Sequence, residues 1–167
     1  TGWEIELSES SDQSIREVLS YQSVEANQEF CKFVRRNYYN WINRRTEDTP
    51  TMSHTLMRTK IFPVADENPK TTLLLIDNFR YDQWRSISSL LRGYYDVVQD
   101  DFYCAILPTA TQYARNAVFA GLMPLAIDKL MPQKWLNDNE EGGKNQYEEE
   151  FLRRLMQQNG KQWRFSF

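Results

Sequence analysis

Two oxygen-bearing residues, Asp77 and Thr111, stand where an α/β protein could carry out phosphate chemistry. Asp77 directly follows residues 71–76, a run that is continuously apolar after two threonines, and Thr111 begins a segment, residues 111–120, with helical spacing. In open α/β sheets, ligands gather at the carboxyl ends of the strands, where loops and helix N-termini share one crevice. An Asp at this edge offers a hard oxygen ligand for Zn, Mg or Mn. A Thr hydroxyl activated by such a metal could act as a nucleophile.

Both residues also have a simpler interpretation as helix caps. An Asp at a strand-to-helix junction commonly accepts a backbone N–H from the first helical turn, and a Thr at a helix start can do the same. From local sequence alone, capping is the commoner role for either residue. Thr109, two positions before Thr111, is a competing nucleophile on chemical grounds.

Arg115 and Asn116 lie one turn further along the helix that Thr111 is expected to begin. Arg115 could bind a phosphate through two parallel hydrogen bonds, although a surface arginine without a substrate role is the commoner outcome. A substrate role for Asn116 has weaker support. His54, the single histidine, lies upstream of the first predicted strand, and we interpret it as structural.

The elements that would position these residues alternate between strands and helices, which predicts an open α/β sheet with flanking helices. A helical segment without Gly or Pro precedes it, over residues 12–42. The predicted strands cover residues 71–76, 94–98, 102–107 and 162–167, with a short strand or packing arm at 56–64; the predicted helices cover residues 79–92, 111–120, 125–130 and 146–158.

Composition narrows the function classes. The chain has 167 residues, a net charge of −3 and a pI near 5.3, so it lacks the basic field that would hold nucleic acid. No apolar run reaches the length of a membrane span, and we expect no membrane insertion. Neither a P-loop, a GxGxxG fingerprint, HExxH nor GxSxG occurs. Cys31 and Cys104 lack CxxC spacing and read as reduced thiols of a cytoplasmic protein.

Two longer stretches carry a family resemblance. Residues 74–84 (LLIDNFRYDQW) and 106–124 (ILPTATQYARNAVFAGLMP) together resemble the signature of the PglZ family, a branch of the alkaline phosphatase superfamily. Residues 134–145, with 37–43 and 52–55 upstream, are similar to the PorX-type response regulators, which Bacteroidetes use with the type IX secretion system. The resemblance divides the chain into three parts: the end of a helical middle domain at 1–45, a linker or arm at 46–70, and the first part of a PglZ domain at 71–167.

The resemblance implies a site. In the superfamily, the acid after the first strand binds metal, and a Ser or Thr at the start of a later helix is both nucleophile and ligand. These roles map onto Asp77 and Thr111. The Pro-Thr-x-Thr pattern of nucleotide pyrophosphatase relatives, in which the second Thr attacks, favours Thr111 over Thr109. Arg115 and Asn116 become the expected substrate-binding residues, and the cofactor is expected to be a divalent metal, as two zinc ions in the complete domain.

The superfamily also uses later Asp and His ligands, and no His follows Thr111. The chain begins with Thr1 and stops after the strand-like residues 162–167. We therefore expect a truncated fragment that is inactive alone, within a parent that hydrolyses phosphodiesters or phosphomonoesters, most plausibly of nucleotides. The resemblance implies a sensor kinase acting through a receiver domain, and secretion-system or transcription components as partners. The alternative is a non-catalytic docking module controlled by phosphorylation-dependent dimerisation.

Overall fold

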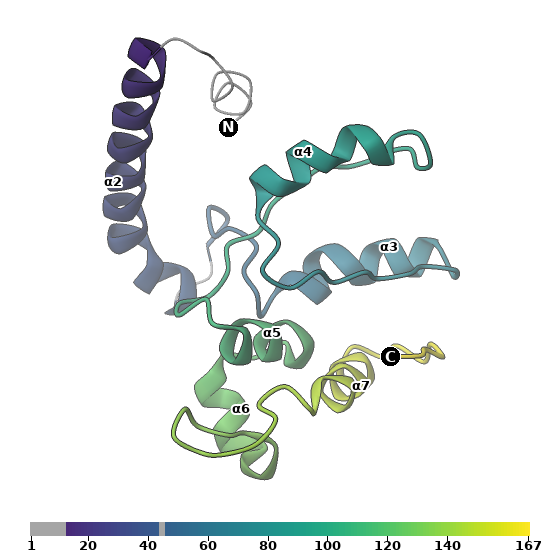
Figure 1. Ribbon diagram of the computed structural model, residues 1–167. Coiled ribbons are helices and arrows are strands. Elements are labelled where there is room, and N and C mark those ends of the chain that lie inside the picture. Colours follow the sequence, from purple (N-terminus) through teal and green to yellow (C-terminus); the bar gives the residue numbers. More distant parts are fainter. Residues whose placement is uncertain (1–12, 44–45) are drawn as a thin grey trace. The chain divides into compact units, whose positions relative to one another are not determined.

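The computed structural model describes residues 13–43 and 46–167, which group into two compact units (Figure 1). The first unit comprises Thr1–Thr49 and Asn78–Asp100, and the second comprises Pro50–Asp77 and Asp101–Phe167. Asp77, Thr111, Arg115 and Asn116 all belong to the second unit.

Among its described residues the first unit has the helices α2 (Gln13–Asn43) and α4 (Tyr81–Leu91). The 31 residues of α2 confirm the helix predicted from the absence of Gly and Pro, although residue 12 lies outside the described residues. None of its residues is buried. Charged residues recur along α2, and no helix in the described ranges combines the length and the apolar character needed to cross a bilayer.

The second unit is built from helices around one apolar core. The order is a π-helical turn (Met57–Ile61), α3 (Phe62–Glu67), α5 (Thr111–Ala120), α6 (Pro124–Leu130), a short 3₁₀ turn (Pro132–Lys134) and α7 (Glu148–Gln158). Pro63 and Pro124 lie in the first turns of α3 and α6, where a missing N–H costs nothing. Of the two expectations for residues 56–64, the short strand is wrong, because this segment is helical, whereas the segment does pack through Met57 and Phe62.

The core of this unit packs one face of α7 against α5. Val118 and Phe119 on α5 meet Phe151, Leu152 and Leu155 on α7, which are spaced three and four apart. The remaining buried members are Met57, Phe62, Ala120, Ile127, Trp135 and Met156. This packing holds α5 and α7 together, and these two helices carry charged residues of the candidate site.

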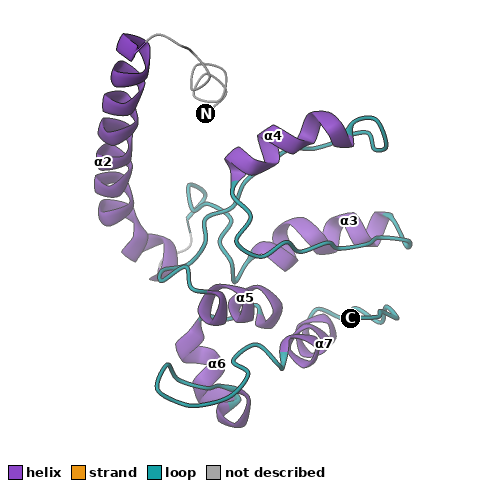
Figure 2. Cartoon of the chain, viewed as in Figure 1, coloured by secondary structure: helices purple, strands orange, loops and turns teal. Residues whose placement is uncertain are grey.

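The predicted α/β open sheet is wrong. Within residues 13–43 and 46–167 the structure has helices and loops, and strand pairing is limited to one isolated parallel bridge between Met52 and Cys104 (Figure 2). Residues 71–76, 94–98 and 162–167 do not form strands, and the predicted strand at 102–107 is reduced to the single bridge residue Cys104. Leu74 is 79% exposed and Val98 is 95% exposed. An apolar run favours extended backbone, but a strand also requires a hydrogen-bonded neighbour, which the run itself does not encode.

Candidate active site on helix α5

The N-terminus of α5 presents the hydroxyl of Thr111 to the carboxylate of Asp77. Thr111 Oγ1 donates a hydrogen bond to Asp77 Oδ2 at 3.3 Å, across 34 positions of sequence. Ala110 is the N-cap residue of α5, and no side chain caps this helix. Thr111 is exposed, and its hydroxyl therefore faces Asp77 rather than the first-turn amides of its own helix.

Asp77 interacts with more than one polar side chain. Its Oδ2 also accepts a hydrogen bond from Arg115 Nη1 at 3.4 Å, one turn beyond Thr111 on α5. Burial, and secondly the negative charge of Asp77, raises the pKa of Tyr103 above its ordinary value. Arg80, not Asp77, occupies the N-cap position of α4. Sequence reasoning did not single out Tyr103, because nothing in its local pattern indicates that it lies near Asp77.

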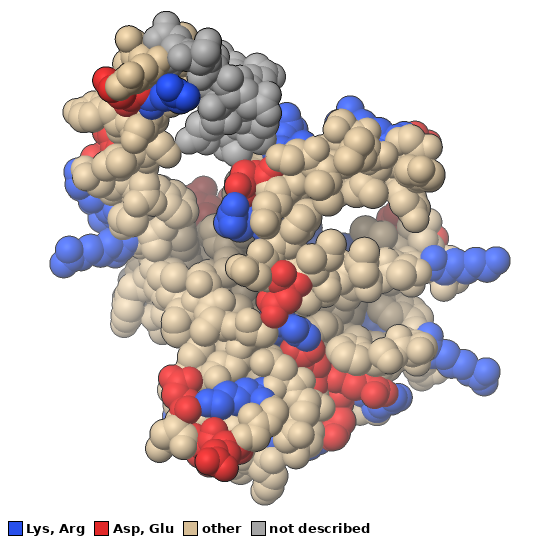
Figure 3. Space-filling view, viewed as in Figure 1, with Lys and Arg blue, Asp and Glu red and all other residues tan. Residues whose placement is uncertain are grey.

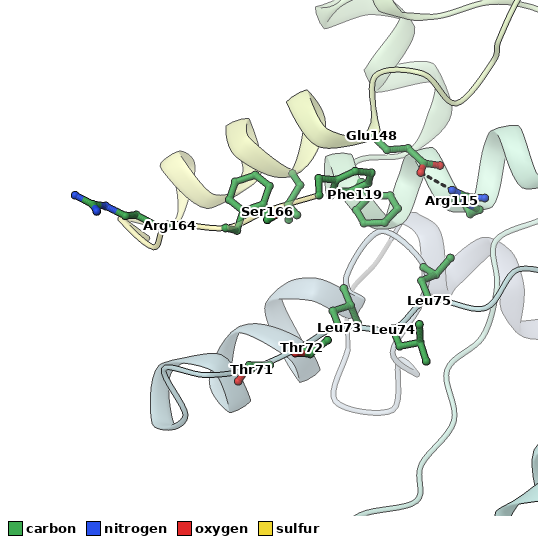
Figure 4. A pocket seen from close by; sticks show the side chains of 13 residues that line it. Thr71, Thr72, Leu73, Leu74, Leu75, Arg115, Phe119, Glu148, Arg164 and Ser166 are labelled. Carbon is green, nitrogen blue, oxygen red and sulfur yellow. Dashed lines mark hydrogen bonds and ion pairs between the residues drawn. The ribbon is translucent and has the colours of Figure 1, made fainter. Parts of the chain in front are cut away.

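Arg115 joins Asp77 to a second acid, Glu148 at the start of α7. Arg115 Nη2 lies 2.5 Å from Glu148 Oε2, and the two side chains point toward one another in Figure 4. Burial acts to lower the pKa of Arg115, but the hydrogen bond and charge of Glu148, followed by those of Asp77, outweigh it and raise that pKa. The guanidinium is therefore a permanent cation beside Thr111.

Asn116 lies beneath this surface. Its side chain is 1% exposed, its Nδ2 donates to the carbonyl oxygen of Lys144 at 2.9 Å, and its Oδ1 accepts from Asn145 Nδ2 at 3.2 Å. Direct substrate binding by Asn116 stays a prediction, and it requires these bonds to be exchanged. Glu148 and Asn145, which sequence reasoning missed, belong to the same network. Three acidic residues in a row, 148–150, are typical of a solvated helix start, so the sequence did not indicate that Glu148 is buried.

A cavity of about 650 Å³ opens beside this cluster (Figure 4). Arg115 and Glu148 line it together with apolar side chains that include Leu73, Leu75 and Phe119. Thr109 is exposed and, among the described residues, makes no hydrogen bond to Asp77. The structure thus brings Asp77, Thr111 and Arg115 together.

The separation of the Thr111 and Asp77 oxygens is that of a hydrogen bond, and it is also compatible with two ligands of one divalent cation. With metal–oxygen distances of about 2.0–2.2 Å, two adjacent ligand oxygens stand roughly 3.0–3.5 Å apart, and Oγ1 and Oδ2 are separated by 3.3 Å. Across the described ranges, no three His, Cys, Asp or Glu residues gather in a way that could hold a metal ion. These two oxygens are therefore a partial ligand set, and Arg115 shares one of them.

Acidic and basic side chains both occur on the face shown in the space-filling view of Figure 3, and no broad basic surface is seen there. An anionic substrate would therefore be attracted by the local cation, Arg115, rather than by a broad basic surface.

Comparison with models of known protein families shows to which family the chain belongs. The family model described as the BREX system PglZ alkaline phosphatase-like domain matches residues 56–166, more than half of the 167 residues. The chain belongs to the PglZ family. The predicted resemblance to the PglZ family is thereby confirmed, and the matched domain has the alkaline phosphatase-like character of a hydrolase superfamily that generally uses divalent metals.

A second family model, for the PorX response regulator linker domain, matches residues 1–42. The PglZ domain of this chain thus follows a PorX-type linker, which confirms the predicted resemblance and indicates the output part of a response regulator. No curated protein compared with the chain gave a match.

Proposed function

We propose that the PglZ domain is a metal-dependent phosphoester hydrolase with Thr111 as its nucleophile, and that it forms the output domain of a response regulator. The observation that carries the proposal is the hydrogen bond of 3.3 Å between Thr111 Oγ1 and Asp77 Oδ2, with Arg115 beside it, inside an alkaline phosphatase-like family match. The substrate class is a phosphodiester or phosphomonoester, with nucleotides as the first candidates.

Thr111 and Asp77 have different roles in the proposed hydrolysis. Thr111 Oγ1 attacks phosphorus and its hydroxyl proton passes to solvent, while the bond to the leaving oxygen breaks and that oxygen departs with its electron pair; a covalent phospho- or nucleotidyl-threonine forms. Water then cleaves the Thr111–phosphorus bond, giving its oxygen to phosphorus and a proton to Oγ1, which restores the hydroxyl. Asp77 Oδ2, which accepts the hydroxyl hydrogen in the structure, fixes the direction in which Oγ1 lone pairs point. A divalent cation bound by Asp77 and Thr111, zinc in our proposal, supplies a lowered hydroxyl pKa and charge compensation at phosphorus.

Two further features favour a phosphoryl group at this place. Arg115 offers guanidinium N–H donors that match phosphoryl oxygens. The first backbone N–H groups of α5 have no partner within the helix, and its positive dipole end attracts anions. Both act most strongly when negative charge builds up on the phosphoryl oxygens in the transition state.

The test compares three variants in the longest natural protein that contains this sequence. Hydrolysis of bis(p-nitrophenyl) phosphate and p-nitrophenyl phosphate is measured with added Zn²⁺ or Mn²⁺ and with a chelator. Thr111→Val is expected to lower kcat by at least about 10³-fold, since it removes the nucleophile. Thr111→Ser is expected to keep part of the activity, and Thr109→Val serves as the matched control. Wild-type protein without hydrolysis under every metal condition, or full activity of Thr111→Val, would contradict the proposal.

A second, regulatory function rests on α2. This helix has no buried residue and carries exposed apolar side chains, among them Val24, Phe30 and Phe33, within the segment that matches the PorX linker. We propose that a second copy of the chain covers this face when a sensor kinase phosphorylates a receiver domain, and that type IX secretion is the process controlled. Light scattering of the full-length protein with and without a phosphoryl mimic, beside Phe30→Lys, tests this; dimerisation that the variant leaves unchanged would exclude α2 as the contact.

A further inference from the structure

Glu148 is a buried carboxylate to which the proposed hydrolysis assigns no role. It is the first residue of α7, and its side chain is 4% exposed, whereas the neighbouring Glu149 and Glu150 are 50% and 53% exposed. Glu149 pairs with Arg153 on the surface of the same helix. A helix start favours acidic residues in general, but that preference does not explain why one of three is buried.

Both oxygens of Glu148 have specific partners. Oε2 accepts from Arg115 Nη2 at 2.5 Å, and Oε1 accepts from Asn145 Nδ2 at 2.9 Å. Asn145 Nδ2 also lies 3.2 Å from Asn116 Oδ1, and Asn116 Nδ2 is held by the carbonyl of Lys144. Since burying a carboxylate is costly unless it is paired and hydrogen-bonded, this network fixes where the carboxylate stands.

The same network fixes the guanidinium. Arg115 Nη2 lies 2.5 Å from Glu148, whereas Nη1 lies 3.4 Å from Asp77. Glu148 is thus the stronger of the two anchors. Nη1 stays on the side of Asp77 and Thr111, where only a long contact holds it.

We propose that Glu148 is a positioning residue that locks Arg115 in the orientation in which Nη1 can bind a phosphoryl oxygen beside Thr111. The inference rests on the proposed function and adds to it the residue that preorganises the anion site. An unanchored arginine would lose side-chain freedom on each binding event, and it could fold over Asp77, its other ion-pair partner among the described residues. Figure 4 shows Glu148 on α7 reaching across to Arg115 on α5 at the edge of the cavity.

The experiment measures affinity for inorganic phosphate and steady-state kinetics in the same full-length protein. Glu148→Gln keeps the shape of the side chain and removes its charge. We expect the phosphate Kd and the KM for the p-nitrophenyl esters to rise about tenfold, with a smaller change in kcat. Glu149→Gln, one residue along the same helix turn, is the matched control and is expected to change neither value. Glu148→Asp retracts the carboxylate by one methylene, and it replaces Glu148→Gln if that variant does not fold.

Chemical rescue separates positioning from a structural role. In Arg115→Ala, added guanidinium is expected to restore phosphate binding, because Glu148 remains to hold the free cation. In the double variant Arg115→Ala with Glu148→Gln, rescue is expected to disappear. An unchanged phosphate Kd in the folded Glu148 variant, equal rescue in both backgrounds, or no phosphate binding by wild type would overturn the inference. Phosphate binding that depends on Glu148 in a protein without hydrolysis would instead contradict the proposed catalysis alone.

Discussion

Gly121 and Leu155 approach so closely that a methyl group at Gly121 would stand 2.5 Å from Leu155 Cδ1. Gly121 ends α5 in the left-handed conformation with φ of 63°, and Leu155 is a fully buried residue of α7. The contact therefore joins the helix that carries Thr111 and Arg115 to the helix that carries Glu148. The packing of these two helices is part of what sets the geometry of the site.

Gly121→Ala is expected to destabilise the protein by about 2–5 kcal/mol. The left-handed conformation costs an alanine roughly 1–2 kcal/mol, and the overlap with Leu155 adds about 1–3 kcal/mol. Gly160→Ala is the matched control, because Gly160 has φ of 67° and nothing within 4 Å of the added methyl group. Urea denaturation of both variants measures the difference, and equal losses would show that the close contact contributes nothing.

Leu155→Ala is expected to lower the free energy of unfolding by about 2–5 kcal/mol, because a fully buried leucine leaves a cavity in the core. Leu130→Ala removes the same atoms from a side chain that is 59% exposed, and it should cost under about 1 kcal/mol. Thermal and urea unfolding of the two variants test the prediction. A loss for Leu130→Ala as large as that for Leu155→Ala would contradict the assigned core.

A buried hydroxyl, that of Ser53, lies next to the isolated bridge at Met52. Ser53 Oγ accepts the backbone N–H of Ile106 at 3.1 Å, and both residues are 0% exposed. Ser53→Ala would leave that N–H unsatisfied, with an expected loss of about 1–3 kcal/mol. Ser86→Ala, at an exposed position of α4 where the hydroxyl returns to the carbonyl of Asp82, should be close to neutral. Amide exchange of Ile106, accelerated in the first variant alone, is the most direct readout.

Cys104 should react with iodoacetamide at higher pH than an ordinary thiol. Burial raises the pKa of Cys104, so its reactive thiolate forms later as pH rises. In the Cys31→Ser background, the midpoint of the rate–pH profile is expected above that of the urea-unfolded protein. The sign for stability follows, since the folded state keeps its proton longer: stability is full below the unfolded pKa and declines as pH rises toward the folded one. Coincident folded and unfolded midpoints would contradict this.

The sequence predicts the helices far better than the sheet, for a physical reason. The segment 111–120 encodes its own helix through local spacing, and Gly121 encodes its end, so α5 is confirmed almost to the residue. Residues 71–76 encode an extended backbone only, because strand pairing depends on a partner elsewhere in the chain. The burial of Glu148 could not be predicted for the same reason. Its carboxylate is held by Arg115 and Asn145, and the acidic residues next to Glu148 in the sequence do not indicate these contacts.

Asp77→Asn is expected to weaken binding of Zn²⁺ by about 10–100-fold, because it replaces a charged oxygen ligand by a neutral amide and leaves the side-chain shape intact. Thr111→Val should weaken binding less, since a neutral hydroxyl is the poorer ligand. Asp128→Asn, on α6, is the control for the loss of one negative charge. Titration calorimetry at two salt concentrations distinguishes direct coordination of Zn²⁺ from non-specific attraction by negative charge. Non-specific attraction would weaken equally in the Asp77 and Asp128 variants and fade with salt, whereas direct coordination persists in salt and is lost with Asp77 alone.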